Sequence, residues 1–372
     1  MERTAAAATR SMEAPPARRI ASEPAALEEI AISCYENDVP AFIEPELERL
    51  YGSIYSSLPQ FRVYTDGSDT SVYIARRGGR IAAIFLFRQR GPCVQVLNEV
   101  MRVEDDDVAC FARYVFATYP TAAVIAFKAV ETAERSSSRL PFPRQRHRHT
   151  EDIVLALPDS ADAYFEMLSK GTRRHFKRRM RKLQDELPSW KFRFLLEDDI
   201  DESTVRAVVE LNRARMAGKH KASAIADDEI GRIARLARER GIAGIIEIDG
   251  RICAGAVGFR AGGNYFLSVL AHDPRYDRYW LGILCCYHTI CECIARGGEE
   301  FHFLWGEYDY KTMLMGVKRD LHNLLVYRSR AHRIRHADIA LTAAAGAAFR
   351  ATRSRLHALV KRLSRAHAPR AS

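Results

Sequence analysis

The fold is decided by 241-GIAGIIEIDGRICAGAVGFRAGGNYFLSVLAHDPRYDRYWLGILCCYHTICECIARGGEEFHFLWGEYDYK-311. Two apolar runs in it flank Asp249-Gly250, a dipeptide that favours the tight turn of a β-hairpin. The predicted order is strand 242–248, strand 252–259, strand 264–271, turn 275–282, helix 283–295, strand 301–305 and Tyr-rich turn 308–314. This order builds a cleft in which a helix begins beside the edge of a strand.

The turn before the helix has the composition of an anion-binding site. A helix N-terminus presents backbone N–H groups that lack a partner within the helix, and this arrangement favours phosphate. Gly282 permits close approach of the backbone, and Arg275 and Arg278 add charge-assisted hydrogen bonds. The alternative is a surface loop whose aromatic side chains cover the core.

The chain also contains an internal repeat. The segments 77-RGGRIAAIFLFRQRG-91 and 248-IDGRICAGAVGFRAGG-263 both place Gly-Arg-Ile after one strand and Phe-Arg at the end of the next. The following helix of the first copy begins with 104-EDDD-107, whose carboxylates would repel a pyrophosphate, whereas the second copy has arginines there. We therefore expect two tandem units, with the ligand in the second. Two unrelated hairpins with a common turn are the alternative, because short turn motifs recur.

This element order, the turn ending in Gly282, the Gly-x-x-x-Tyr-Lys of 306–311 and the basic helix near 172–182 together resemble the GNAT superfamily of N-acetyltransferases. Within it, the chain is similar to the branch with a CelD/BioF-like acetyltransferase domain, which occurs in cellulose-biosynthesis proteins and is related to the Fem peptidoglycan transferases. The resemblance covers residues 150–330 well and 40–150 weakly. It implies an α/β (α+β) fold of tandem GNAT-like domains, each a mixed, mostly antiparallel sheet flanked by helices.

The expected organisation has four parts. These are a disordered lead over 1–25, a degenerate N-terminal GNAT-like domain over 26–150, a C-terminal GNAT acyltransferase domain over 151–330 and a basic helical tail over 331–372. We also expect a helical segment over 24–37, a strand over 61–64 and a polar link over 131–150.

The resemblance implies acetyl-CoA or another acyl-CoA as co-substrate. In GNAT relatives, a splay or bulge in the strand that corresponds to 264–271 exposes backbone N–H groups to the acyl carbonyl and the pantetheine. The implied cofactor-binding residues are Val269, Leu270, Ala271, Arg275, Arg278 and Gly282. An ordinary core strand is the alternative. The turn departs from the family pattern, since it has a single glycine and several bulky aromatic side chains, and this leaves a different donor open.

Acyl transfer to an amine requires a proton acceptor for the amine and a proton donor for the departing thiolate. GNAT enzymes often use a tyrosine after the last strand of the motif as the acid, which implies Tyr310 here, or else Tyr308. Glu307 is a candidate base. Many relatives carry an acid at the position of His302, so the base function either moves to His302 or is lost. Lys311 is a candidate for binding an anionic acceptor; a packed ring and a solvated amine are the alternatives for Tyr310 and Lys311.

The positive charge is concentrated in two segments. The chain has a net charge of +10, and residues 170–182 carry eight Lys/Arg and no acid. We expect an anionic partner at the helix 172–182, with Arg174 and Arg178 in contact with substrate. A nucleotide-sugar diphosphate, the CoA 3′-phosphate, tRNA and anionic lipid are candidates, and a solubilising face is the alternative. Residues 331–372 either lie on an anionic membrane surface or form a loose extension.

Composition favours a reduced, cytoplasmic protein, with peripheral membrane association as an option. No apolar run approaches the roughly 18 residues of a membrane helix, and the N-terminus lacks the apolar core of a secretory signal. The eight cysteines are scattered, and four lie on the predicted helix 283–295, where they cannot form a disulfide framework. We expect no metal centre, because the Cys and His residues of that helix point in different directions.

Three functions fit these observations. The first is an acyl-CoA-dependent N-acyltransferase that acts on a small-molecule or saccharide amine, such as an amino sugar or an envelope-polysaccharide precursor. The second is a Fem-like transferase that moves an aminoacyl group from tRNA to a cell-wall precursor, and only this function involves nucleic acid. The third is a non-catalytic scaffold of a polysaccharide-synthesis complex. We expect the acceptor in the crevice between the two copies.

Overall fold

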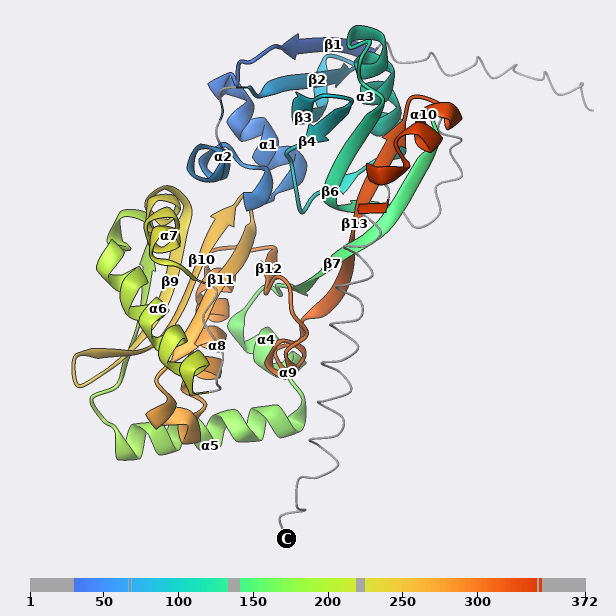
Figure 1. Cartoon of the computed structure of the whole chain (residues 1–372). Helices are drawn as coiled ribbons and strands as arrows, with labels where there is room; N and C mark the ends of the chain where they lie inside the picture. The colour runs from blue at the N-terminus through green and yellow to red at the C-terminus, as the bar shows by residue number, and fades with distance from the viewer. Residues whose placement is uncertain are drawn as a thin grey trace, which may run out of the picture.

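The computed structural model describes residues 30–339, except 66, 68, 133–140 and 219–224, together with 341 and 342. Its strands form one continuous sheet in the order β1-β2-β3-β4-β6-β13-β7-β12-β11-β10-β9-β8, with β5 paired to β6 outside this path. Two α/β units lie at opposite ends of this sheet (Figure 1). The predicted lead over 1–25 and most of the predicted tail lie outside the described residues.

The first unit contains β1 (Ile30–Tyr35), α1 (Glu44–Tyr51), α2 (Leu58–Tyr64), β2 (Ser71–Arg77), β3 (Arg80–Arg90), β4 (Cys93–Val96), β5 (Arg102–Val103), α3 (Asp105–Thr118) and β6 (Val124–Thr132). The 3₁₀ turns η1 (Ala41–Ile43) and η2 (Ile54–Ser56) connect its first elements.

The rest of the described chain contains β7 (Arg144–Ala156), α4 (Ala161–Met167), α5 (Lys170–Glu186), β8 (Lys191–Leu196), η3 (Glu197–Asp199), α6 (Glu202–Ala217), α7 (Asp227–Arg240), β9 (Gly241–Ile248), β10 (Arg251–Ala261), β11 (Asn264–His272), η4 (Pro274–Tyr279), α8 (Leu281–Ala295), β12 (Glu300–His302), α9 (Asp309–Met313), β13 (Val317–Tyr327) and α10 (Arg330–Arg335).

The two units repeat one topology. Each has an antiparallel hairpin, a third strand, a helix and a strand that returns parallel to the third. The elements are β2-β3-β4-α3-β6 in the first unit and β9-β10-β11-α8-β12 in the second. The predicted tandem arrangement of mixed, mostly antiparallel sheets is therefore confirmed.

A ribbon made of β7 and β13 connects the units. β13 pairs with β7 from Val317 to Val326, and its second half pairs with β6 of the first unit. Figure 1 shows the two long strands side by side, running from one unit into the other. Residue 150, the predicted boundary, falls inside β7, and residues 144–150 are strand rather than the polar link that we expected. The division into domains at 150 and 330 remains a prediction.

Two local predictions are wrong. Residues 30–35 form an edge strand instead of a helix, because Ile30, Ile32 and their neighbours pair with β2. Residues 58–64 form helix α2 instead of a strand. Ser57 caps this helix by accepting the backbone N–H of Gln60, and Pro59 lies in its first turn, which is a helix start signal.

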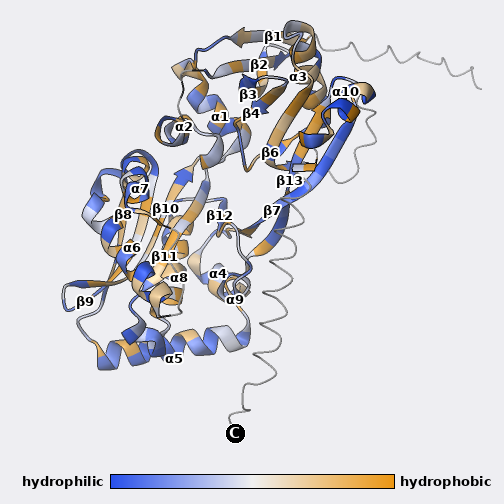
Figure 2. Cartoon of the chain, viewed as in Figure 1, coloured by the Kyte–Doolittle hydropathy of each residue, from blue (hydrophilic) through white to orange (hydrophobic). Residues whose placement is uncertain are grey.

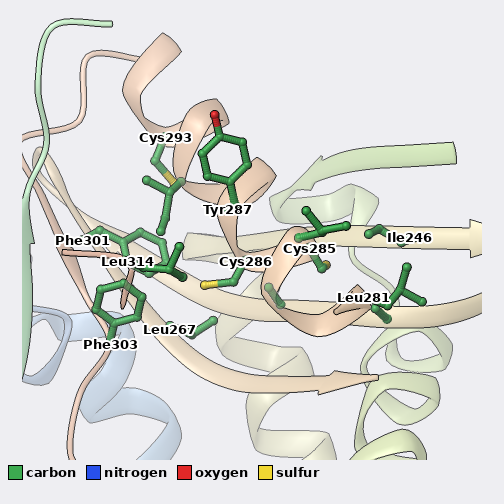
Figure 3. Packing of buried hydrophobic residues seen from close by; sticks show 14 of the residues in the cluster. Ile246, Leu267, Leu281, Cys285, Cys286, Tyr287, Cys293, Phe301, Phe303 and Leu314 are labelled. Carbon is green, nitrogen blue, oxygen red and sulfur yellow. The ribbon is translucent and has the colours of Figure 1, made fainter. Parts of the chain in front are cut away.

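Helix α8 is buried in the core of the second unit. Its residues Cys285, Cys286 and Cys293 are fully buried and pack against the strands, as Figure 3 shows. The close approach of helix and sheet depends on Gly244, because a Cβ there would lie 1.9 Å from Thr289 Oγ1. The cysteines of this helix thus act as small apolar residues. No helix in the described part of the chain is long and apolar enough to cross a membrane.

Candidate active site

Strands β11 and β12 separate partway along β11. They pair in parallel only over Asn264↔Glu300, Tyr265↔Phe301 and Phe266↔His302. β12 ends there, and the next residue, Phe303, donates its N–H to the carbonyl of Ile153 on β7 (2.8 Å). Leu304 then adopts a left-handed conformation with φ of 56°. In the described chain, β11 beyond Phe266 therefore has a strand partner on one side only.

A β-bulge lies in the same part of β11. Val257 of β10 pairs with Val269, whereas the next residue, Gly258, pairs with Leu267, so Ser268 is the extra residue. A Cβ at Gly258 would lie 2.3 Å from the carbonyl oxygen of Phe266. Such bulges re-aim backbone groups beside active sites. The predicted donor residues Val269, Leu270 and Ala271 follow the bulge, and their role stays a prediction.

Lys311 fixes the path that the chain takes after β12. Its ammonium group donates to the carbonyl oxygens of Phe303 (2.8 Å), Leu304 (2.9 Å) and Trp305 (2.7 Å). The side chain is buried, and burial lowers the pKa of its ammonium group to about 8. All three N–H donors are engaged inside the protein, so the geometry gives no support to the predicted contact with an anionic acceptor.

The turn before α8 folds as η4, with its arginines exposed at the mouth of the helix. Arg275 pairs with Asp273 (2.5 Å), and Arg278 pairs with Glu186 of α5 (3.3 Å). Each predicted phosphate ligand thus already has a carboxylate partner. Gly282 is buried, and a Cβ there would lie 2.6 Å from His272 Nδ1. Packing against His272 at the end of β11 thus accounts for this glycine, and the expected approach of its backbone to phosphate stays a prediction.

The basic helix α5 packs by its few apolar residues and exposes most of its cations. Figure 2 shows it as mostly hydrophilic, in contrast to the strands of the second unit. Arg173 pairs with Glu166, and Arg179 donates to the carbonyl of Arg278 and lies over the Trp280 ring. The predicted substrate ligands Arg174 and Arg178 are exposed, and neither has a carboxylate partner in the described chain. They lie on a different element from the cavity described next.

A cavity of about 410 Å³ lies where the two units meet. The second unit and the ribbon contribute Asp152, Asn264, Phe266, Glu300, His302, Arg319 and Leu321, and the first unit contributes Tyr51, Gly52, Val100, Met101, Arg102 and Glu131. Paired residues of neighbouring strands share a face, and so do alternate residues of one strand. This places the polar side chains of five adjacent strands on one face of the sheet.

His302 forms the floor of this cavity together with two carboxylates. Its Nδ1 lies 2.7 Å from Asp152 Oδ2, its Nε2 lies 3.3 Å from Glu300 Oε2, and its ring stacks on Phe266 with a centroid distance of 4.3 Å. Arg319 in turn donates to both oxygens of Glu300 (2.8 and 2.5 Å). The charged groups on either side of His302 thus hold its imidazole in one orientation.

The neighbours of His302 determine its titration. Burial by itself lowers the pKa of the imidazole, but the carboxylates of Asp152 and Glu300 outweigh burial and raise it above the usual value. Burial likewise favours the neutral form of Glu300, but His302 and Arg319 lower the pKa of this carboxyl to about 2. A histidine with a raised pKa is a suitable proton acceptor near neutral pH.

Three buried polar atoms of this cavity lack a hydrogen-bond partner within the described structure. They are Asp152 Oδ1, Asn264 Oδ1 and His302 Nε2. Buried polar atoms are rarely left unpaired, and each exception calls for an explanation. Two of the three can only accept hydrogen bonds, so the floor of the cavity is suited to a ligand that donates N–H or O–H groups.

The other predicted catalytic residues lie apart from this cavity. Tyr310 is partly buried and packs on Phe303, and burial raises the pKa of its hydroxyl. Tyr308 is exposed and stacks on Tyr310, while Glu307 pairs with Lys318 (2.5 Å). The structure thus separates His302 from the group around Tyr310, and the roles of these residues stay predictions.

The first unit has no equivalent free strand edge in its described residues. After β4 the chain pairs with β6 again, since Val100 N–H donates to the carbonyl of Ala129 (2.9 Å) and β5 resumes the parallel ladder at Arg102↔Glu131. Asp107 at the start of α3 is paired with Arg77 (2.5 Å). The placement of the donor in the second unit stays a prediction.

Four residues of this cavity are not among those expected from the sequence: Asp152, Asn264, Glu300 and Arg319. The signal that was available is polarity in buried strands, because 300-EFH-302 alternates charged and apolar residues and Asp152 begins the apolar run 153-IVLAL-157. A second hollow of about 590 Å³, between residues 141–143 and α10, is lined by no acid or base except two arginines. No group of three or more His, Cys, Asp or Glu in the described chain is arranged to hold a metal ion.

Residues 170–312 match the family model described as acetyltransferase (GNAT) domain. The chain contains a GNAT domain. This match extends from α5 to α9 and includes β11, its bulge, the turn before α8 and His302. The placement in a CelD/BioF-like branch stays a prediction.

Solved structures with the same fold extend beyond the GNAT domain into the first unit. FemX has a TM-score of 0.57 at 7% sequence identity and covers 81% of this chain and 98% of its own. The structure of L-PGS from Bacillus licheniformis has a TM-score of 0.50 at 13% identity and covers 79% of this chain and 93% of its own. At such identities the similarity concerns the fold alone. No curated protein matches the chain by sequence.

Proposed function

We propose that this protein is an acyl-CoA-dependent N-acyltransferase that transfers an acetyl or longer acyl group to an amine. The observation that supports this most directly is the combination of a bulged, one-sided β11 with a buried His302–Asp152 pair in the adjacent cavity. The strand edge is suited to the extended pantetheine arm, and the cavity is suited to the acceptor. An amino sugar or an envelope-polysaccharide precursor in the cytoplasm is the acceptor class that the CelD/BioF resemblance adds.

The reaction needs no covalent intermediate, because holding both reactants in place supplies much of the acceleration. The amine nitrogen attacks the thioester carbonyl, the backbone N–H groups of 269–271 stabilise the oxyanion, and the C–S bond breaks. His302 in its neutral form accepts the proton of the amine through Nε2, while Nδ1–H stays on Asp152. Tyr310, or a water molecule, returns a proton to the thiolate.

The phosphates of the donor lie at η4 in this proposal. Arg275 and Arg278 must exchange their carboxylate partners, Asp273 and Glu186, for phosphate oxygens. Both arginines are exposed, and exposed ion pairs contribute little stability, so this exchange is feasible.

Calorimetry with acetyl-CoA tests the donor site. We expect binding to the wild-type protein, and Arg278→Glu should weaken it by about tenfold or more, because it replaces an attractive charge with a repulsive one. Lys318→Glu is a matched control on another surface and should bind as the wild type does. Absence of CoA binding in the wild type would overturn the proposed donor.

Acetyl transfer tests the catalytic assignment. With glucosamine as a first acceptor, His302→Gln should lower kcat by about a hundredfold, since it removes a general base, while acetyl-CoA binding stays intact. Unchanged turnover in His302→Gln would show that the base lies elsewhere.

A Fem-like, aminoacyl-tRNA-dependent transferase is the second candidate. Two observations favour it. Cations of α5 such as Arg174 and Arg178 are exposed and have no carboxylate partner in the described chain, whereas the arginines of η4, which would bind the phosphates of CoA, are already paired with carboxylates. A gel-shift titration with bulk tRNA distinguishes the tRNA-dependent from the acyl-CoA-dependent transferase, because binding through phosphates falls steeply with salt. Absent or salt-insensitive binding rejects this candidate.

A further inference from the structure

The cavity between the units holds a buried carboxylate oxygen that no protein group meets. Asp152 is 3% exposed; its Oδ2 lies 2.7 Å from His302 Nδ1, and its Oδ1 has no partner in the described structure. Asn264 Oδ1 of the same cavity is also unmet, because this amide uses its nitrogen to donate to the carbonyl of Gly52 (2.9 Å). A ligand with several N–H or O–H donors, such as an amino group, would satisfy both oxygens.

A second carboxylate, Glu131, lines the opposite wall of the cavity and belongs to the first unit. Within the described residues it makes no ion pair. The two nearby arginines are engaged elsewhere: Arg102, its register partner, bonds Glu104 (2.9 Å), and Arg319 forms two bonds with Glu300. Arg319 also interacts electrostatically with Glu131 but makes no ion pair with it, so this carboxylate can still accept a charge-assisted bond from a ligand.

The strand order fixes the relation of these two positions. Glu131 lies on β6 and Asp152 on β7, and β13 separates these strands. Neighbouring strands are about 4.8 Å apart, so the two backbones are separated by roughly 10 Å. Both side chains line the same cavity, and one small, extended molecule can reach both.

We propose that the cavity binds a diamine, with the amino group that is acylated at Asp152 and a second ammonium group at Glu131. This narrows the acceptor of the proposed N-acyltransferase to molecules with two amino groups, a diamino sugar included, so glucosamine would be a poor acceptor; it rests on that function for the reaction, but not for the binding. The first unit, whose described residues offer no opened strand edge like that of β11, would then determine which acceptor is used.

Other classes of amine fit the charges less well. The carboxylate of an amino acid would meet Glu131 and be repelled. A monoamine or an uncharged polyol would leave Glu131 with only the electrostatic influence of Arg319, which is itself bonded to Glu300, and a carboxylate without a direct partner is unfavourable when the ligand excludes water. A second ammonium group removes this charge imbalance.

Binding of two amines of equal length to the full-length protein tests the proposal without any donor. In calorimetry, cadaverine should bind at least about tenfold more tightly than pentylamine, which lacks the second amino group, because a charge-assisted bond is lost. Glu131→Gln should reduce cadaverine binding to the pentylamine level and leave pentylamine binding unchanged. Glu46→Gln, a matched substitution on the surface of α1, should behave as the wild type.

The outcomes separate this proposal from the proposed function. Equal binding of the two amines, or cadaverine binding that Glu131→Gln does not change, overturns the diamine assignment even if acetyl transfer to another amine occurs. Selective, Glu131-dependent binding supports it even if acetyl-CoA proves not to be the donor.

Discussion

His302 illustrates how neighbouring charges change the proton affinity of one side chain. Only the neutral imidazole can accept a proton, and the carboxylates of Asp152 and Glu300 hold the pKa above its ordinary value of about 6.5. We therefore expect kcat/KM for acetyl transfer to rise with pH through an inflection above that value. Asp152→Asn removes one of the two charges, so its inflection should move to lower pH.

A pH–rate profile of both proteins checks this expectation. A wild-type inflection below that of free histidine, or identical profiles for the wild type and Asp152→Asn, would contradict it. Acetyl-CoA binding, followed over the same pH range, serves as the control for effects on the donor.

Lys311 makes a prediction about stability. Burial lowers the pKa of its ammonium group from 10.5 to about 8 in the folded protein. Between these pH values the unfolded chain keeps a proton that the folded chain has lost, so the free energy of unfolding rises with pH across this window. From the lower to the upper end of this pH window, the free energy of unfolding of the wild type should rise by on the order of 3 kcal/mol relative to that of Lys311→Met.

Urea unfolding of both proteins at several pH values across this window measures the difference. A constant difference between the wild type and Lys311→Met would show that Lys311 titrates normally. The comparison with Lys311→Met is needed because buried tyrosines and cysteines titrate in the same range.

At the scale of elements, the bulge in β11 depends on a glycine in the neighbouring strand. The backbone of Phe266 and Leu267 approaches Gly258 so closely that an added Cβ would lie 2.3 Å from a carbonyl oxygen. Gly258→Ala should therefore destabilise the protein by about 1–3 kcal/mol, as overpacking does, and weaken acetyl-CoA binding. Gly250→Ala is the control: it lies at a turn with open space around it, so it should strain the turn but leave the bulge and acetyl-CoA binding unchanged.

Thermal unfolding and calorimetry measure the two effects. A Gly258→Ala variant with wild-type stability and donor binding would show that the strand can form without the bulge.

Local elements of the second unit could be predicted from sequence because local chemistry determines them. Asp249 and Gly250 both have positive φ (52° and 73°), as the predicted hairpin turn requires, and the predicted apolar helix corresponds to α8. Residues 30–35 were mispredicted as helix because an edge strand depends on its partner, β2, which lies 40 residues away. The segment 58–64 was mispredicted although Ser57 and Pro59 carried a helix start signal.

The acid–base site could be predicted only in part. His302 was a candidate from its place in the family pattern, but its partner Asp152 is 150 residues away in sequence. Such a contact depends on β7 pairing with β12, and strand pairing of this kind leaves no local signal. The cavity was expected between the two copies, whereas Glu131 and Arg102 could not be assigned to it without the register of β5 and β6.

At the scale of the whole molecule, the units are joined by more than the chain. Arg240 of α7 pairs with Glu44 (2.8 Å) and Glu48 (2.6 Å) of α1, and the second half of β13 pairs with β6. A fragment of residues 151–330 would lose all these partners and the first half of β7. We expect this fragment to be unfolded or aggregated, whereas the full chain unfolds cooperatively.

Circular dichroism and limited proteolysis of the fragment check this prediction. A fragment that melts cooperatively and resists protease as the full chain does would show that the second unit is an independent domain.

The β7–β13 ribbon has a further consequence for how acceptors are chosen. Because both strands stay hydrogen-bonded from one unit into the other, the walls that carry Asp152 and Glu131 belong to a single piece of sheet. Strand pairing therefore sets the distance between these two positions before a ligand binds. If the proposed diamine binds there, we expect selection by length to need no closing movement of the two units.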